Sequence, residues 1–421
     1  MTSLVPRQLF AALFLLLIPL VATLGQTISA TWLGGSGIWS DGSLWSTSPV
    51  FPNNGSNNYL VTIDSGSVAL DQPITVNELT FGSPGVLPTL DLGSNTLVTR
   101  DFTLRSGTVT GAGALIVTGS WQWQNGFLIG DGATHALNGI AFVDASSSSF
   151  GRLDRALNCY GDSFVNTNAP YMEELDFGPN AALNIMPEAS MNGSRLMILG
   201  SDMSGIISGA ITNHGTLVVD DPGLNRGMLV FGSNFINEGT VKITNSSLDL
   251  RVPSDQPALL QNAGSIELDN GRLWLTPFGR LNGGTLRGNG EVGNLESNAR
   301  IDPTGAGFDF ANSRLTLLPQ SVVAYTFRQP SKRTPITCPR ITNVFAASLD
   351  GTLEITVDGN LQSRIKPSSV FTILVAQSIT GQFVNATDGA RLQTTDGRGS
   401  FLVRYTSTTV ELTDFKLNKR H

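Results

Sequence analysis

A seven-residue stretch, NHGTLVV at residues 213–219, decides the fold, because variants of it follow at similar intervals. They are NEGTVKI at 237–243, NAGSIEL at 262–268 and, more loosely, NGGTLRG at 282–288. The asparagines that open these stretches are 24, 25 and 20 residues apart. Self-similarity at a period of about 20–50 residues is typical of solenoids, in which each repeat packs only on its neighbours.

Each repeat combines a turn with a short strand. The Asn-x-Gly start suits a corner because glycine tolerates positive φ, and apolar residues such as Leu217 and Val219 follow at alternate positions. Alternate side chains of a strand lie on one face, and coils stacked about 4.8 Å apart would align them into a continuous core. We therefore predict an all-β fold, a right-handed parallel β-helix (solenoid) with a C-terminal β-rich subdomain.

The composition agrees with many short strands. Only 14% of residues are charged and 46 are glycine, and strand-and-turn alternation is also present upstream, at 90–93, 95–98, 106–109 and 113–117. The alternative is a β-sandwich array, whose domains also contain short strands joined by regular turns. No Cys-Trp-Cys spacing supports that alternative.

The N-terminal residues predict export. Residues 1–8 carry one positive charge, at Arg7, and residues 9–22 form an unbroken apolar run. This is the order of a secretory signal peptide, and the run is shorter than the roughly 20 apolar residues that span a bilayer. We expect a signal peptide at 1–25 and a mature chain without a membrane span, secreted to the extracellular space or held at the cell surface.

The remaining chain divides by composition into five regions. The tryptophan-rich start is expected to cover the first coil, whose open edge would otherwise invite strand addition. A proline-rich interruption around Cys338 predicts a linker. The predicted regions are an N-terminal cap at 26–64, the solenoid at 65–320, the linker at 321–345, a C-terminal β subdomain at 346–415 and a basic tail at 416–421.

A family resemblance rests on these repeats and on both ends of the chain. The opening has TWLGG at 31–35, GIWS at 37–40, LWS at 44–46 and PNN at 52–54; GTLRGNG follows at 284–290, and the closing part has LDGTLEI at 349–355, FTIL at 371–374, GQF at 381–383 and VELTDF at 410–415. The chain resembles the exported bacterial β-helix proteins related to autotransporter passengers and adhesins. The resemblance implies an extracellular scaffold. The C-terminal membrane barrel of autotransporters is not expected here, because no series of alternating ten-residue strands follows the closing segment.

The search for chemistry gives no catalytic assignment. With 26 basic and 33 acidic residues, the chain has a net charge of −7, which argues against a nucleic-acid partner. His214 occupies a position that varies between repeats, and Asp220 and Asp221 match polygalacturonase motifs only in the wrong order. Phosphate-loop, nucleophile-elbow and zinc-hydrolase motifs are absent. We therefore expect no catalytic residue, no metal site and no cofactor.

Two sets of residues are candidates for other roles. The indoles could stack on sugar rings or instead be buried in the cap and core; this set comprises Trp32, Trp39, Trp45, Trp121 and Trp123. Export would permit Cys159 and Cys338 to form a disulfide, and the alternative is two unrelated thiols.

Three functions are compatible with this sequence. The first is a non-enzymatic scaffold or adhesin-like protein that binds a cell-surface or matrix polysaccharide or protein through an extended solenoid face. The second is a carbohydrate-active enzyme, either a lyase or a hydrolase, which would need acidic residues from adjacent coils to meet a basic residue in one groove. The third is a carbohydrate-binding protein that uses exposed indoles, which buried indoles would argue against.

Overall fold

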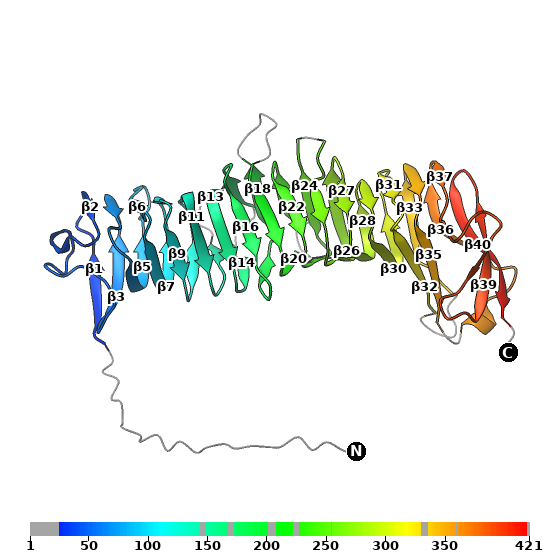
Figure 1. The fold of residues 1–421 in the computed structure, drawn as a ribbon, viewed down its shortest axis with the longest axis horizontal. Coiled ribbons are helices and arrows are strands. Elements are labelled where there is room, and N and C mark those ends of the chain that lie inside the picture. Colours follow the sequence, from blue (N-terminus) through cyan, green and yellow to red (C-terminus); the bar gives the residue numbers. More distant parts are fainter. Residues whose placement is uncertain are drawn as a thin grey trace, which may run out of the picture.

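The protein is an elongated stack of coils, with β1 at one end and β40 at the other (Figure 1). The computed structural model describes residues 25–143, 149–166, 172–200, 208–221, 227–253, 255–329, 336–358 and 361–418. Residues 1–24 of the predicted signal peptide and 419–421 of the predicted basic tail lie outside the described residues. Within the described part, the helices are two single turns, η1 (Gly42–Leu44) and η2 (Gln362–Arg364).

Each coil contributes to three faces that run along the rod, and strands of successive coils pair in parallel on each face. Face one contains β2 (Ser36–Ile38), β4 (Ser67–Ala69), β6 (Thr89–Asp91), β8 (Thr108–Thr110), β15 (Glu173–Phe177), β18 (Leu196–Gly200), β21 (Met228–Phe231), β24 (Ser247–Arg251), β33 (Arg340–Val344) and β36 (Phe371–Ala376). Face two contains β9 (Ala114–Val117), β16 (Ala182–Ile185), β19 (Ala210–Asn213), β22 (Asn234–Asn237), β25 (Leu259–Gln261), β27 (Gly279–Leu281), β29 (Leu295–Ser297), β31 (Arg314–Leu317), β34 (Ala346–Leu349) and β37 (Ile379–Gly381). Face three contains β1 (Thr27–Thr31), β3 (Asn58–Ile63), β10 (Trp121–Trp123), β12 (Ala141–Val143), β14 (Ser163–Asn166), β17 (Ser190–Asn192), β20 (Thr216–Asp220), β23 (Thr240–Thr244), β32 (Val322–Phe327) and β35 (Thr352–Val357).

Longer strands turn a corner and so belong to two faces. Those that pass from face two to face three are β5 (Ile74–Phe81) and β7 (Thr96–Leu104). Those that pass from face one to face two are β11 (Phe127–Ala136) and β13 (Ser149–Cys159). Those that pass from face three to face one are β26 (Ser265–Thr276), β28 (Thr285–Val292) and β30 (Arg300–Asp309).

The core consists of apolar columns inside the coils, as the repeats predict. Leu217 and Val219 are buried, and in the next coil they are in register with the buried side chains of Val241 and Ile243. One such column contains Leu217, Val241, Ile266, Leu286, Ile301, Val323 and Leu353. The predicted β-helix is therefore confirmed. The β-sandwich alternative is wrong, because the strands of successive coils pair in parallel along one stack.

The repeat asparagines have a role in addition to the predicted turn. Asn213 and Asn237 are fully buried at the ends of β19 and β22, and Gln261 follows them in register. The Asn213 amide donates to Asn237 Oδ1 at 2.8 Å, and the Asn237 amide donates to Gln261 Oε1 at 3.0 Å. These residues directly precede the bends of the predicted turns, and they form a hydrogen-bonded amide ladder inside the core.

The N-terminal end is closed by the tryptophan-rich segment. Trp45 packs against Trp32 and Trp39, with ring centroids 5.0 and 4.9 Å away. The Ser46 amide donates to Thr31 O, and the Leu33 amide donates to Leu44 O. This return of the chain occupies backbone groups at the end of β1, on the edge that no other coil of the described residues covers.

The parallel stack is longer than predicted at both ends. It begins inside the predicted cap, because β1 already pairs in parallel with β3. The residues of β3 alternate between buried and half-buried, as in the later coils. The predicted linker contains β32 and β33, and residues 330–335 of it lie outside the described residues. In the predicted C-terminal subdomain, β34, β35 and β37 are still parallel rungs. Antiparallel pairing closes the stack: β36 pairs with β40 (Thr409–Leu417), β40 with β39 (Gly399–Tyr405), and β39 with β38 (Arg391–Gln393).

Candidate functional site

The five predicted indoles are buried. Each of them has an exposed fraction of 3% or less; they are Trp32, Trp39, Trp45, Trp121 and Trp123. The indole N–H groups of Trp39 and Trp45 donate to backbone carbonyls of Pro52 and Trp39. A ring without an exposed face cannot stack on a ligand, so these side chains pack the core and the N-terminal end and are not a ligand-binding strip.

The two predicted cysteines are far apart along the rod. Cys159 is buried at the end of β13, Cys338 lies half-buried before β33, and both are free. The register runs from Cys159 through the rungs of Ile185, Asn213 and Asn237, and β33 lies beyond them. At about 4.8 Å per rung, this separation exceeds the roughly 7 Å between Cα atoms that a disulfide can bridge. The structure therefore favours two unrelated thiols over a disulfide.

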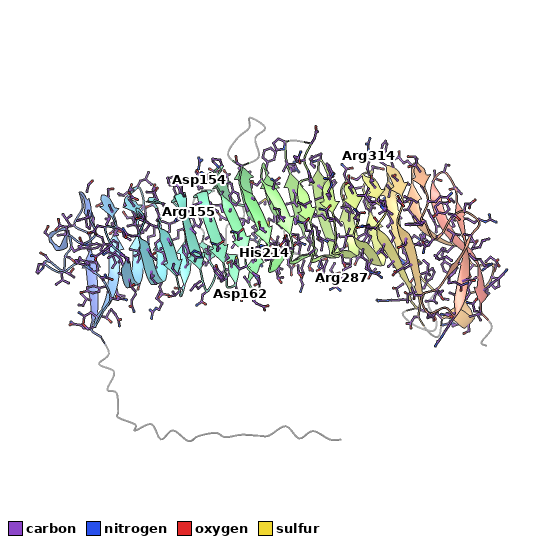
Figure 2. The ribbon with its side chains drawn as sticks, in the orientation of Figure 1. Asp154, Arg155, Asp162, His214, Arg287 and Arg314 are labelled. Atoms are coloured by element: carbon purple, nitrogen blue, oxygen red, sulfur yellow. The ribbon has the colours of Figure 1, made fainter. Side chains whose placement is uncertain are left out.

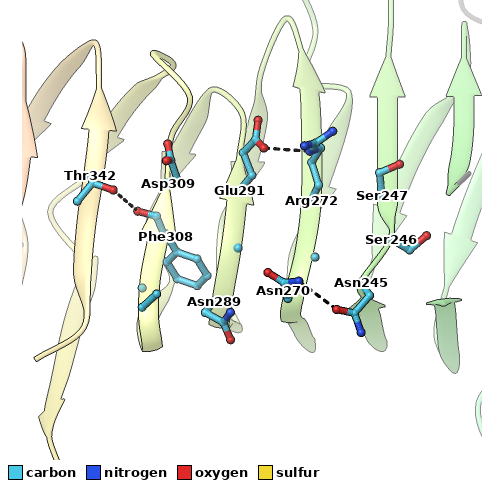
Figure 3. Close-up of a pocket in the computed structure, with 14 residues that line it drawn as sticks. Asn245, Ser246, Ser247, Asn270, Arg272, Asn289, Glu291, Phe308, Asp309 and Thr342 are labelled. Carbon is cyan, nitrogen blue, oxygen red and sulfur yellow. Dashed lines mark hydrogen bonds and ion pairs between the residues drawn. The ribbon is translucent and has the colours of Figure 1, made fainter. Parts of the chain in front are cut away.

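A polar groove of about 490 Å³ lies at the corner where β26, β28 and β30 turn from face three to face one (Figure 3). It crosses successive coils, so its long direction follows the axis of the rod. Most of its walls are amide, hydroxyl or charged side chains. The lining residues are Asn245, Ser246, Ser247, Asn270, Gly271, Arg272, Asn289, Gly290, Glu291, Ala306, Gly307, Phe308, Asp309 and Thr342.

Glycines form part of this groove because the coils approach one another too closely for a side chain. Gly271 and Gly290 are paired in register, and the strands shift register at this corner. A Cβ on Gly290 would collide with the Gly271 carbonyl oxygen, and a Cβ on Gly307 would collide with the Arg340 backbone. The result is a strip of bare backbone between two rows of side chains.

One row consists of amides. Asn245 and Asn270 have φ of 47° and 52°, a left-handed conformation that asparagine tolerates better than most residues. The Asn270 amide donates to Asn245 Oδ1 at 3.0 Å. The Asn289 amide continues the row, and it has no hydrogen-bond partner among the described residues. Its donors and acceptor are therefore available to a ligand.

The other row is charged. Ser247, Arg272, Glu291 and Asp309 follow one another in register on adjacent coils. Arg272 Nε donates to Glu291 Oε2 at 2.9 Å. Asp309 accepts hydrogen bonds from the Ala311 amide and the Asn343 side chain. Two carboxylates and one guanidinium thus meet in a single groove, with a net charge of −1.

A sixth tryptophan borders this row, and the sequence analysis did not select it. Leu273 and Leu275 point into the core, so the alternation of β26 places Trp274 on the outside, half-exposed. The guanidinium carbon of Arg272 lies 5.8 Å from the centre of the indole ring. The signal was present in the sequence, since Trp274 lies between two leucines and would be expected outward by the period of a strand.

A second hollow, on face three, is less suited to a ligand. It measures about 540 Å³ and lies over an alternating row of charges, in which Lys242, Glu267, Arg287 and Asp302 are paired in register. Arg287 forms an ion pair with Glu267. Opposite charges on adjacent strands stabilise the stack, and the Arg287–Glu267 pair at the centre of this row is already satisfied.

A buried guanidinium elsewhere on the rod also has a structural role. Arg155 on β13 is 1% exposed, and burial lowers its pKa to about 10. It donates to three backbone carbonyls of the two preceding coils, those of Gly113, Ile129 and Ala133. Figure 2 labels Arg155 in the N-terminal half of the rod. Arg155 therefore satisfies carbonyl groups at a corner where β11 shifts register.

The fold and the groove define the class, an elongated three-faced parallel β-helix with a polar groove along one corner. No family model, curated protein or solved structure matches the chain. Across the described ranges, no helix is both long and apolar enough to cross a membrane. In the same ranges, no group of three or more His, Cys, Asp or Glu side chains is placed to hold a metal ion.

Proposed function

We propose that this protein is a secreted or surface-associated, non-enzymatic scaffold of adhesin-like type, which binds a cell-surface or matrix polysaccharide or protein through its extended solenoid face. The observation that carries this proposal is the polar groove, which crosses adjacent coils and is lined by a row of amides that includes Asn289, unpaired among the described residues. The leader-like residues 1–25, directly before β1 at Thr27, support export.

A second candidate function is polysaccharide cleavage. Glu291 and Asp309 lie on adjacent coils, and Arg272 lies beside Glu291, which is the arrangement expected of a carbohydrate-active enzyme on this fold. Against it, Glu291 is engaged by Arg272, and both oxygens of Asp309 accept hydrogen bonds. These contacts hold both carboxylates in place, so neither is free to reach a glycosidic oxygen as acid or base. The geometry therefore supports binding better than cleavage.

A combined retention and cleavage assay tests both functions. Purified protein is passed over immobilised polysaccharides and over an extracellular-matrix protein preparation, and the eluates are assayed for reducing and unsaturated ends. Retention without product is the expected result. Product that disappears in Glu291→Gln would overturn the non-enzymatic proposal in favour of cleavage, and absence of retention on every surface would refute binding altogether.

A further inference from the structure

The groove and its border combine an aromatic surface with unsatisfied polar groups. Trp274 exposes part of its ring beside Arg272. Asn289 lines the groove and is half-exposed, and its side-chain amide has no hydrogen-bond partner in the described part of the chain. Its N–H donors and its carbonyl oxygen can therefore pair with a ligand that supplies hydrogen bonds.

The chemistry of such a ligand follows from the lining. A pyranose ring has an apolar C–H face that packs on an indole and hydroxyls that pair with amides and serines. The carboxylates of Glu291 and Asp309 outnumber the single guanidinium of Arg272, so an anionic sugar would meet net repulsion. A volume of about 490 Å³ is sufficient for a short oligosaccharide segment.

The orientation of the ligand relative to the rod follows from the register of the strands that line the groove. The groove residues Ser247, Arg272, Glu291 and Asp309 occur once per coil, at rungs about 4.8 Å apart. A chain that contacts all of them must run along the rod axis. This matches an extended polymer better than a compact small molecule.

We propose that this groove binds a neutral, hydroxyl-rich glycan chain along the rod axis, with one sugar ring stacked on Trp274. The inference rests on the proposed binding function and names its site and ligand class. Asn289 supplies hydrogen bonds to the hydroxyls, and Glu291 and Asp309 select against acidic glycans.

Isothermal titration calorimetry tests this assignment on the whole protein with three probes: neutral β-glucan oligosaccharides, neutral mannan oligosaccharides and acidic oligogalacturonides. We expect at least one neutral probe to bind and the acidic probe to bind more weakly. Trp274→Ala should weaken neutral-glycan affinity about tenfold, as for a central aromatic contact. Trp274→Phe should restore part of it, and Asn289→Ala should weaken it about fivefold.

The matched control is Tyr160→Ala, which removes another exposed aromatic side chain at the end of β13, away from the groove. Its affinity should equal that of the unaltered protein, and circular dichroism should show the same strand signal in every variant. Unchanged affinity in both Trp274→Ala and Asn289→Ala, or preference for the acidic probe, overturns the inference. If no oligosaccharide binds while matrix protein retains the chain, the glycan inference fails and the scaffold proposal stands.

Discussion

The buried amide ladder allows a sharp test of what holds the coils in register. Asn237 accepts a hydrogen bond from Asn213, donates one to Gln261 Oε1 at 3.0 Å and donates another to Ser265 O at 3.3 Å, and it is fully buried. Asn237→Ala removes all three bonds. It leaves Gln261 Oε1 without this donor in the core.

The loss of stability expected in Asn237→Ala follows from these contacts. A buried hydrogen bond contributes about 1 kcal/mol net, and an orphaned buried partner costs about 1–3 kcal/mol. We therefore expect Asn237→Ala to destabilise the surrounding coils by about 3 kcal/mol, which raises their opening equilibrium constant roughly hundredfold. Because long repeat arrays do not always unfold in one step, the suitable assay is hydrogen exchange followed by mass spectrometry on peptides that cover β22, β23 and β25.

An exposed amide pair supplies the control. The Asn282 side chain donates to Asn262 Oδ1 at 3.0 Å across two coils, but Asn262 and Asn282 are exposed. Water replaces such a bond, so Asn262→Ala should change local stability by less than about 0.5 kcal/mol. Equal protection loss in Asn237→Ala and Asn262→Ala would refute the reasoning, because it would show that burial does not set the strength of the ladder.

Three further predictions concern a buried cation, a buried thiol and a corner glycine. Arg155→Met should lower the free energy of unfolding by about 3 kcal/mol, because three carbonyls lose their donor; calorimetry measures this, and an unchanged melting temperature would contradict it. Burial raises the pKa of Cys159 from 9.0 to about 12, so the protonated thiol stabilises the fold below about pH 9 and this contribution is lost as the pH rises toward 12. The stability difference between the unaltered protein and Cys159→Ala should therefore shrink over that range in denaturant titrations, and a constant difference would disprove the linkage. Gly290→Ala should cost about 2 kcal/mol or more, because its Cβ meets the Gly271 carbonyl at a φ of 150°, whereas Gly55→Ala, which meets no atom within 4 Å, should be neutral in the same thermal unfolding assay.

The fold could be predicted because the interior of a β-helix repeats. Leu217 and Val241 must occupy equivalent rungs in successive coils, so their alternation recurs in the sequence. The asparagine was recognised as part of the repeat, but its role was not. A corner residue and a ladder residue show the same recurrence, and only the packing places Asn213 and Asn237 inside the core.

The limits of the stack could not be predicted from composition, because strands also form within the tryptophan-rich and proline-rich segments. Tyr325 and Phe327 lie on β32 inside the predicted linker, and both are buried. Tyr325 donates its hydroxyl hydrogen to Ile373 O at 2.9 Å, which ties this coil to the closing strands. The amino-acid composition of a whole segment cannot reveal such contacts. A strand of only six residues, such as β32, is enough to complete a rung within a segment that otherwise resembles a linker.

The groove could not be predicted from the repeats, because its residues do not recur. Arg272, Glu291 and Asp309 lie 19 and 18 residues apart and share a row only through the register shifts at the corner. Outward positions of a β-helix are not constrained by core packing, so they are free to differ from coil to coil. A large aromatic residue at such a position, as with Trp274 between Leu273 and Leu275, is not stabilised by packing in the core. An outward tryptophan beside an irregular corner is therefore a better guide to the binding face of a solenoid than the number of its tryptophans.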